Sequence, residues 1–130
     1  QKQWSLNKVK LHGHVLKNAE LHLNGQIGLI TITQEILKKT ETTIEDCEGL
    51  VNYIRNIKSV KVAISLREDE PDKIKFSLRS YGNVNVQQMA SSLGGGGHRN
   101  ASGGTLEMSL TQAREKILDT VRRYLGRGKG

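Results

Sequence analysis

Hydrophobic positions along the first third of the chain predict a helix, a hairpin and a second short helix. We interpret residues 6–18 as a helix, although their apolar positions follow neither the helical nor the strand period cleanly. Apolar and polar residues alternate over 21–23, up to Asn24-Gly25, a dipeptide that readily forms a type I′ turn. Residues 27–33 are rich in β-branched side chains and complete a predicted β-hairpin. A short helical turn is expected over 34–39.

The middle of the chain predicts one long helix and a second hairpin. Residues 42–45, Thr-Thr-Ile-Glu, have the pattern of a capping box. The apolar residues after it recur at helical spacing and predict a helix to residue 57: Ile44, Cys47, Leu50, Val51, Ile54 and Ile57. Strict alternation over 60–67 and 73–81 predicts two strands that are joined by an acidic turn. Paired as a hairpin, these strands would have one apolar face and one polar, basic face.

The last third predicts two more helices and a closing strand. Residues 86–93 have a short helical pattern that begins after Asn85 and ends at Gly94. A last strand is expected over 105–108, and a final helix follows with the apolar stripe Ala113, Ile117, Leu118, Val121 and Leu125. The predicted fold is α/β: a mixed β-sheet of about five strands with helices packed mainly on one face.

Composition limits what this domain can be. Its 130 residues are enough for one domain, and 20 lysines and arginines against 13 acids give a formal charge of +7. That excess favours a polyanionic partner such as a nucleotide or RNA. Cys47 is the single cysteine, so no internal disulfide forms, and its place on an apolar stripe indicates a buried small hydrophobe. No apolar run is long enough to cross a bilayer, and we expect a cytoplasmic protein.

The most informative segment is the glycine run at residues 94–104, Gly-Gly-Gly-Gly-His-Arg-Asn-Ala-Ser-Gly-Gly. Without Cβ atoms the backbone can reach positive φ angles, approach a ligand closely and turn its amides toward an anion. His98 could donate a hydrogen bond to a phosphate or a base, and Arg99 adds charge. The alternative is a helix C-cap followed by a flexible connection. No Lys-Ser/Thr follows, so this is not a Walker loop.

Arg79 is the second candidate binding residue. It ends a predicted strand on the polar face, shortly before the glycine run, and a guanidinium can bind phosphate bidentately. The alternative is a solvated surface arginine. Metal and nucleophilic chemistry are poorly supported, because His12, His14 and His22 are not accompanied by a carboxylate cluster and no base accompanies Cys47. The chain therefore resembles a binding domain more than a complete catalyst.

Residues 95–103, Gly-Gly-Gly-His-Arg-Asn-Ala-Ser-Gly, resemble the signature of the DHHA1 domain, the C-terminal half of DHH-family phosphoesterases. The resemblance covers nearly the whole chain and includes the Asn24-Gly25 hairpin, residues 30–35 and the strand at 77–80. This version of the motif is most similar to the oligoribonuclease (nanoRNase) and 3′-phosphoadenosine 5′-phosphate (pAp) phosphatase branch. Cyclic-di-AMP phosphodiesterases and RecJ-like exonucleases carry related loops and remain alternatives.

The resemblance implies a parent hydrolase that degrades short oligoribonucleotides and dephosphorylates pAp with two manganese ions. These ions would be held by an N-terminal DHH domain, whose Asp-His-His motif is absent from this chain, so the metal centre cannot be assembled here. We therefore expect a C-terminal fragment that holds no metal or cofactor. Residues 1–18 would be the end of an interdomain linker, 19–125 the DHHA1 substrate-binding domain and 126–130 a flexible tail.

The same resemblance implies the binding residues Arg79, Gly96, Gly97, His98, Asn100, Ser102 and Gly103. Arg79 and His98 would hold the phosphate and terminal nucleotide of short RNA or pAp, facing the catalytic centre across a cleft. The glycines would let the backbone approach the ligand closely. Asn100 and Ser102 either shape the loop or contact the ligand.

A third possibility is a non-catalytic RNA-binding module similar to the C-terminal domain of alanyl-tRNA synthetase. Such a module would contact many phosphates, and its affinity would fall steeply with salt. Aromatic residues are only 4% of the chain, which makes a broad base-stacking platform improbable.

Overall fold

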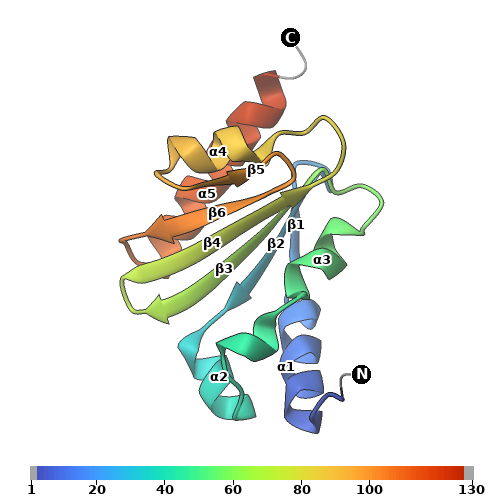
Figure 1. Ribbon diagram of the computed structural model, residues 1–130, viewed down its shortest axis with the longest axis vertical. Coiled ribbons are helices and arrows are strands. Elements are labelled where there is room, and N and C mark those ends of the chain that lie inside the picture. Colours follow the sequence, from blue (N-terminus) through green and yellow to red (C-terminus); the bar gives the residue numbers. More distant parts are fainter. Residues whose placement is uncertain (1–2, 128–130) are drawn as a thin grey trace.

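The computed structural model describes residues 3–127 and shows a mixed six-stranded sheet in the order β1-β2-β3-β4-β6-β5 (Figure 1). In chain order the elements are α1 (Leu6–Lys17), β1 (Glu20–His22), β2 (Ile27–Ile32), α2 (Gln34–Thr40), the 3₁₀ helix η1 (Ile44–Cys47), α3 (Leu50–Arg55), β3 (Val62–Glu70), β4 (Lys73–Ser80), α4 (Val86–Ser92), β5 (Gly96–His98), β6 (Ala101–Leu106) and α5 (Leu110–Arg127). The predicted α/β class is confirmed, with six strands where about five were expected.

Strand pairing follows the turns that the sequence encodes. β2 and β3 are parallel and are connected through α2, η1 and α3, whereas every other neighbouring pair is antiparallel. In the β1–β2 hairpin, Asn24 and Gly25 have φ angles of 55° and 83°. The Gln26 amide donates to the Leu23 carbonyl at 3.1 Å. Two consecutive positive φ angles define the predicted type I′ turn, which is confirmed.

Helices cover both faces of the sheet, which differs from the expectation that they pack mainly on one face (Figure 1). The core on the first face joins the strands to α4 and α5 through Val86, Met89, Ala90, Ala113, Ile117, Leu118 and Val121. The core on the second face joins them to α1, α2 and α3 through Leu11, Val15, Ile36, Leu50, Val51 and Ile54. The reason is β2, whose Ile27 and Leu29 enter the first core while Ile30 and Ile32 enter the second. A strand that is apolar on both faces needs a layer on each side.

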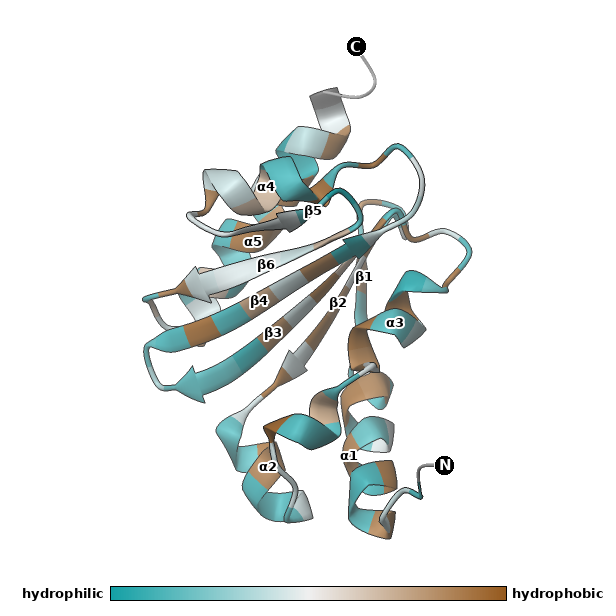
Figure 2. Ribbon diagram, in the orientation of Figure 1, coloured by the Kyte–Doolittle hydropathy of each residue, from teal (hydrophilic) through white to brown (hydrophobic). Residues whose placement is uncertain are grey.

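The predicted hairpin of β3 and β4 is confirmed, and it leaves one polar face beside the second helical layer. On β4, Ile74, Phe76 and Leu78 are fully buried in the first core. Their neighbours Lys75 and Ser77 point to the opposite face. Figure 2 shows the corresponding alternation of hydrophobic and hydrophilic residues along β4. The helices of the second layer contact β2, β3 and β4, so the sheet beyond β4 keeps an open face.

The helix expected to run continuously to residue 57 is interrupted. The chain forms one 3₁₀ turn, η1, and then the separate helix α3, because Gly49 between them has a φ of 87°. The cap also lies one residue later than the pattern suggested. Asp46 accepts a hydrogen bond from the Thr43 amide at 2.9 Å and completes a capping box there.

A helix lies near each end of the described chain. α1 lies in the segment expected to end a linker, and its Leu11 and Val15 are buried in the second core. α5 extends through Gly126 to Arg127, two positions of the expected tail, and 128–130 lie outside the described residues. Within the described part of the chain, no helix combines the length and apolar character that crossing a membrane requires.

Candidate anion-binding site

The glycine run forms a β-hairpin where a loop was expected. Gly96, Gly97 and His98 make the edge strand β5, which pairs with the start of β6 through a turn at Arg99-Asn100. The closing strand therefore begins at Ala101, four residues earlier than predicted. Figure 2 shows β6 in near-neutral colours, since it consists mostly of small residues.

Most of these glycines allow backbones to pack closely against one another. A Cβ on Gly103 would lie 2.5 Å from the Phe76 carbonyl oxygen of β4. A Cβ on Gly97, whose φ is 141°, would lie 2.7 Å from the Ala101 carbonyl oxygen. Gly96 differs, because an added Cβ there would meet no atom within 4 Å. Gly96 alone among these three therefore opens onto free space.

The side chains of Asn100 and Ser102 hold the hairpin in place. Asn100 donates to the Ser80 hydroxyl at 2.9 Å and to the Gly82 carbonyl at 3.2 Å. The Ser102 hydroxyl is buried and donates to the Val86 carbonyl at 2.8 Å. Of the two roles that the sequence left open, the structure supports shaping of the hairpin for both residues.

Arg79 and His98 lie in one row across three strands. Arg79 of β4 is opposite Ala101 of β6, and Ala101 is opposite His98 of β5. Directly opposed residues project their side chains from the same face. Two strand spacings place the Cα atoms of Arg79 and His98 about 10 Å apart. The structure thus brings the two main candidates together on the open face.

The charge of Arg79 is not neutralised by any acid among the described residues. One of its Nη atoms donates to the carbonyls of Leu78 at 3.0 Å and Ser102 at 3.4 Å. Among residues 3–127, no carboxylate forms an ion pair with it. Burial lowers the pKa of Arg79 from its ordinary value, and the nearby charge of Arg55 lowers it further. A half-buried cation without an acid is suited to bind an anion.

Two adjoining hollows form a groove on the open face and share Lys75, Ser77 and Arg79. The first hollow, of about 300 Å³, lies over the glycine hairpin, and its remaining lining residues are Gly96, Gly97, Ala101, Ser102 and Gly103. The second, of about 270 Å³, lies between the sheet and the segment from η1 to α3. Apolar and polar residues line it, among them Ile44, Cys47, Glu48, Val51, Ser65 and Arg67. The groove therefore offers cations beside both polar and apolar surface.

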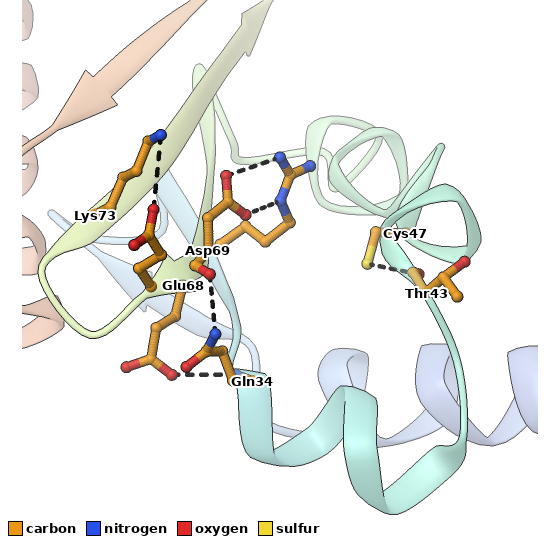
Figure 3. A network of polar contacts seen from close by, with 8 residues as sticks. Gln34, Thr43, Cys47, Glu68, Asp69 and Lys73 are labelled. Carbon is orange, nitrogen blue, oxygen red and sulfur yellow. Dashed lines mark hydrogen bonds and ion pairs between the residues drawn. The ribbon is translucent and has the colours of Figure 1, made fainter.

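The cations of the groove are not equivalent. Arg67 donates to both carboxylate oxygens of Asp69, at 2.6 and 3.1 Å (Figure 3). That carboxylate neutralises Arg67, whereas Lys75 and Arg79 have no such partner among the described residues. Cys47 also borders the groove and directs its thiol to the Thr43 carbonyl at 3.8 Å (Figure 3). Burial raises the pKa of this thiol to about 11, so it is neutral.

Comparison with known proteins identifies the family and supports the fold. The model of the DHHA1 domain matches residues 29–127. The chain belongs to the DHHA1 domain family. It is 37% identical over 119 residues to a bifunctional oligoribonuclease and PAP phosphatase NrnA of Thermus thermophilus, covering 91% of this chain and 35% of the relative. The protein of the same name from Mycoplasma genitalium is 33% identical, with 78% of this chain and 31% of the relative covered.

A solved structure supports the same assignment. The crystal structure of an exopolyphosphatase-related protein from Bacteroides fragilis superimposes with a TM-score of 0.81 at 32% identity. The match covers 96% of this chain and 36% of that protein. This DHHA1 domain therefore spans about a third of the length of the relatives that it matches.

The described residues of this DHHA1 domain offer no metal site, since no three His, Cys, Asp or Glu side chains gather in one place. His12 is buried and contacts the Asp46 carbonyl at 2.7 Å. His14 is exposed, and His22 pairs with Glu20 at 2.9 Å. The family resemblance implies manganese, but these residues do not fit such a centre.

Sequence reasoning missed Arg55 of α3, which lies close enough to Arg79 for its charge to act there. The helical pattern of apolar residues gives no signal for Arg55. Its proximity depends on how α3 crosses β3 and β4, which hydrophobic spacing does not encode. Lys75 and Ser77, by contrast, lie on the polar strand face that alternation predicted.

Proposed function

We propose that this DHHA1 domain binds the phosphate and terminal nucleotide of pAp or short oligoribonucleotides. It would act as the substrate-binding C-terminal part of a manganese-dependent phosphoesterase with an N-terminal DHH domain. The observation that carries the proposal is the row of Arg79 and His98, which project from one open face. No acid in the part of the chain that the structure describes pairs with the arginine. The names of the two similar NrnA proteins support the choice of ligand.

In this proposal each residue has a distinct role. The formal charge of +7 attracts small anions, and the guanidinium of Arg79 binds phosphate oxygens through parallel N–H groups. His98, exposed on the edge strand, donates to the phosphate or to the nucleotide. Gly96 leaves space for the ligand beside them. Asn100, Ser102 and Gly103 fix the hairpin that positions His98.

Titration calorimetry of this chain with pAp tests the proposal. Arg79→Ala and His98→Ala should each weaken binding by about 1 to 3 kcal/mol, or about 5- to 150-fold, because each removes a hydrogen bond to a charged group. The matched control is Arg122→Ala, which removes an exposed charge of α5 on the other side of the sheet. Equal affinity of the parent and both groove variants would contradict the proposal.

Titration of the same chain with long RNA tests the RNA-binding alternative. A module for long RNA would bind a long single strand more tightly than pAp, with a steep dependence on salt. The proposed site instead prefers ligands of one to a few nucleotides, and Arg79→Ala should remove most of that affinity.

A further inference from the structure

A third hollow, of about 200 Å³, lies beside the groove and is lined by residues in and next to α1 and α3. We call it the aromatic pocket, and its lining residues are Trp4, His12, Glu48, Gly49, Asn52, Tyr53 and Asn56. Glu48 and Gly49 also line the second hollow of the groove, so the two hollows adjoin at these residues. The side chain of Asn56 accepts a hydrogen bond from the Tyr81 hydroxyl, just beyond the end of β4. The aromatic pocket therefore continues the groove past the start of α3.

Two half-exposed aromatic rings line this pocket. Trp4 is 44% exposed and Tyr53 is 49% exposed, although the chain has only five aromatic residues in all. Both contact the buried ring of His12, whose centroid lies 4.6 Å from that of Trp4 and 6.1 Å from that of Tyr53. The Lys8 ammonium lies 4.1 Å from the centroid of the Trp4 ring and forms no ion pair with an acid of the described chain. Exposed rings beside an unpaired cation are typical of sites where a nucleobase stacks next to its phosphate.

The polar groups of the aromatic pocket are suited to the edge of a base. Asn52 and Asn56 are one helical turn apart, so their amides lie on the same side of α3. The side chain of Asn52 has no hydrogen-bond partner among residues 3–127. An asparagine amide presents a donor beside an acceptor, which is the pair that the edge of adenine requires. The two amides therefore offer hydrogen bonds to a base that enters from the groove.

His12 leaves one acceptor without a donor in the same place. Its Nε2 lies 2.7 Å from the Asp46 carbonyl oxygen, which only accepts, so the neutral ring carries its proton on Nε2 and leaves Nδ1 as an acceptor. Nδ1 is buried and has no partner in the described part of the chain. An apolar side chain in the pocket would leave both Nδ1 and the Asn52 amide unpaired. A nucleobase instead brings a flat ring together with N–H donors, and it is the ligand class that fits.

We propose that the aromatic pocket binds the base of the second nucleotide of a short RNA, stacked against Tyr53 and Trp4. This inference rests on the proposed function, which assigns the terminal nucleotide and its phosphate to the row of Arg79 and His98. It adds a second subsite, which recognises a ring instead of a phosphate. The mononucleotide pAp has no second base and leaves the aromatic pocket empty, whereas a dinucleotide occupies both the groove and the pocket.

Calorimetry with pApA and with an analogue that lacks the second base tests the subsite. The parent chain should bind pApA about tenfold more tightly than the analogue, because one stacked base contributes affinity on that order. Tyr53→Leu removes the ring and should reduce the preference to about twofold or less, with the affinity for the analogue unchanged. The matched control Tyr53→Phe keeps the ring and should retain the preference. Both variants should unfold at the same urea concentration as the parent, because the Tyr53 side chain is half exposed.

Trp4 reports on the pocket directly, because it is the single tryptophan of the chain. Titration with pApA should change its fluorescence, and the analogue without the second base should not. Adenosine distinguishes a base held as part of RNA from a free nucleoside. It should change the same fluorescence only at concentrations about tenfold or more above those of pApA, because it has no phosphate to bind in the groove.

Three outcomes would overturn the assignment of the aromatic pocket. Equal affinity of the parent for pApA and the analogue would mean that no base enters the pocket. A preference for pApA that Tyr53→Leu leaves intact would place the second base elsewhere. Adenosine that binds as tightly as pApA would assign the pocket to a free nucleoside. Each of these results leaves the proposed function standing, which fails separately if Arg79→Ala and His98→Ala bind pAp as the parent does.

Discussion

Replacement of Gly96 by alanine tests whether this glycine leaves space for the ligand, in contrast to the glycines that allow the strands to pack closely. An added Cβ at Gly96 meets no atom within 4 Å, and the methyl group would stand in the hollow beside Arg79. Folding should tolerate the change or gain about 0.4 to 1 kcal/mol, because alanine restricts the unfolded chain. Binding should weaken, because the methyl group displaces the ligand from its charged hydrogen bonds, a loss of about 1.5 to 3 kcal/mol.

Two other glycines provide the matched controls. Gly13→Ala in α1 also meets nothing within 4 Å, and it should stabilise the helix by about 1 kcal/mol without changing affinity for pAp. Gly103→Ala would place its Cβ 2.5 Å from the Phe76 carbonyl oxygen and force β4 and β6 apart. Such overpacking costs about 1 to 3 kcal/mol of folding free energy, or more where backbone must move.

Urea unfolding and calorimetry with pAp measure the two effects independently. The expected pattern is that Gly96→Ala loses affinity at full stability, Gly103→Ala loses stability, and Gly13→Ala loses neither. If Gly96→Ala binds pAp as the parent does, the ligand does not rest beside Gly96. If Gly96→Ala is as unstable as Gly103→Ala, the open position of Gly96 is refuted.

Two further predictions concern titratable groups away from the phosphate row. Hydrogen bonding to Arg114 is the main cause that lowers the pKa of Glu20 below its ordinary 4.5. Its contribution to stability, at most about 1 kcal/mol for a partly exposed pair, is present at neutral pH and lost as pH falls below 4.5. Glu20→Gln should therefore lower the unfolding free energy at neutral pH only, and an equal loss in acid would contradict the pairing. Because burial raises the pKa of Cys47 to about 11, iodoacetamide should alkylate it more slowly in the folded chain than in urea, and equal rates would refute its burial.

Segments with a clear hydrophobic period were predictable from sequence, and segments without one were not. The alternation of apolar and polar residues over β3 and β4 predicted both strands and their polar face. Asn24-Gly25 predicted the turn of the first hairpin. β5 and the start of β6 were missed because glycine has low strand propensity and no side chain to show a period. The break at Gly49 was missed because the apolar spacing around it continues in helical phase, while the backbone leaves the helix.

The candidate site was predictable in its residues but not in its architecture. Arg79 and His98 followed from a strand end and a motif, and the structure aligns them across β4, β6 and β5. The glycines suggested an anion held by backbone amides, whereas the packing around Gly97 and Gly103 shows that they bring strands together. Arg55 had no signal in the sequence, because its place depends on the crossing of a helix over the sheet.

A site built on strands differs physically from one built on a loop. The separation of Arg79 and His98 is set by two strand spacings, about 10 Å, and the hydrogen bonds of Asn100 and Ser102 resist any change in it. A loop could contract around one phosphate, but a paired sheet cannot, so the row has a fixed span. This span suits a ligand that is longer than a bare phosphate, such as the nucleotide of the proposed function. We therefore expect free inorganic phosphate to bind this groove weakly, and a nucleotide to gain further affinity from its nucleoside.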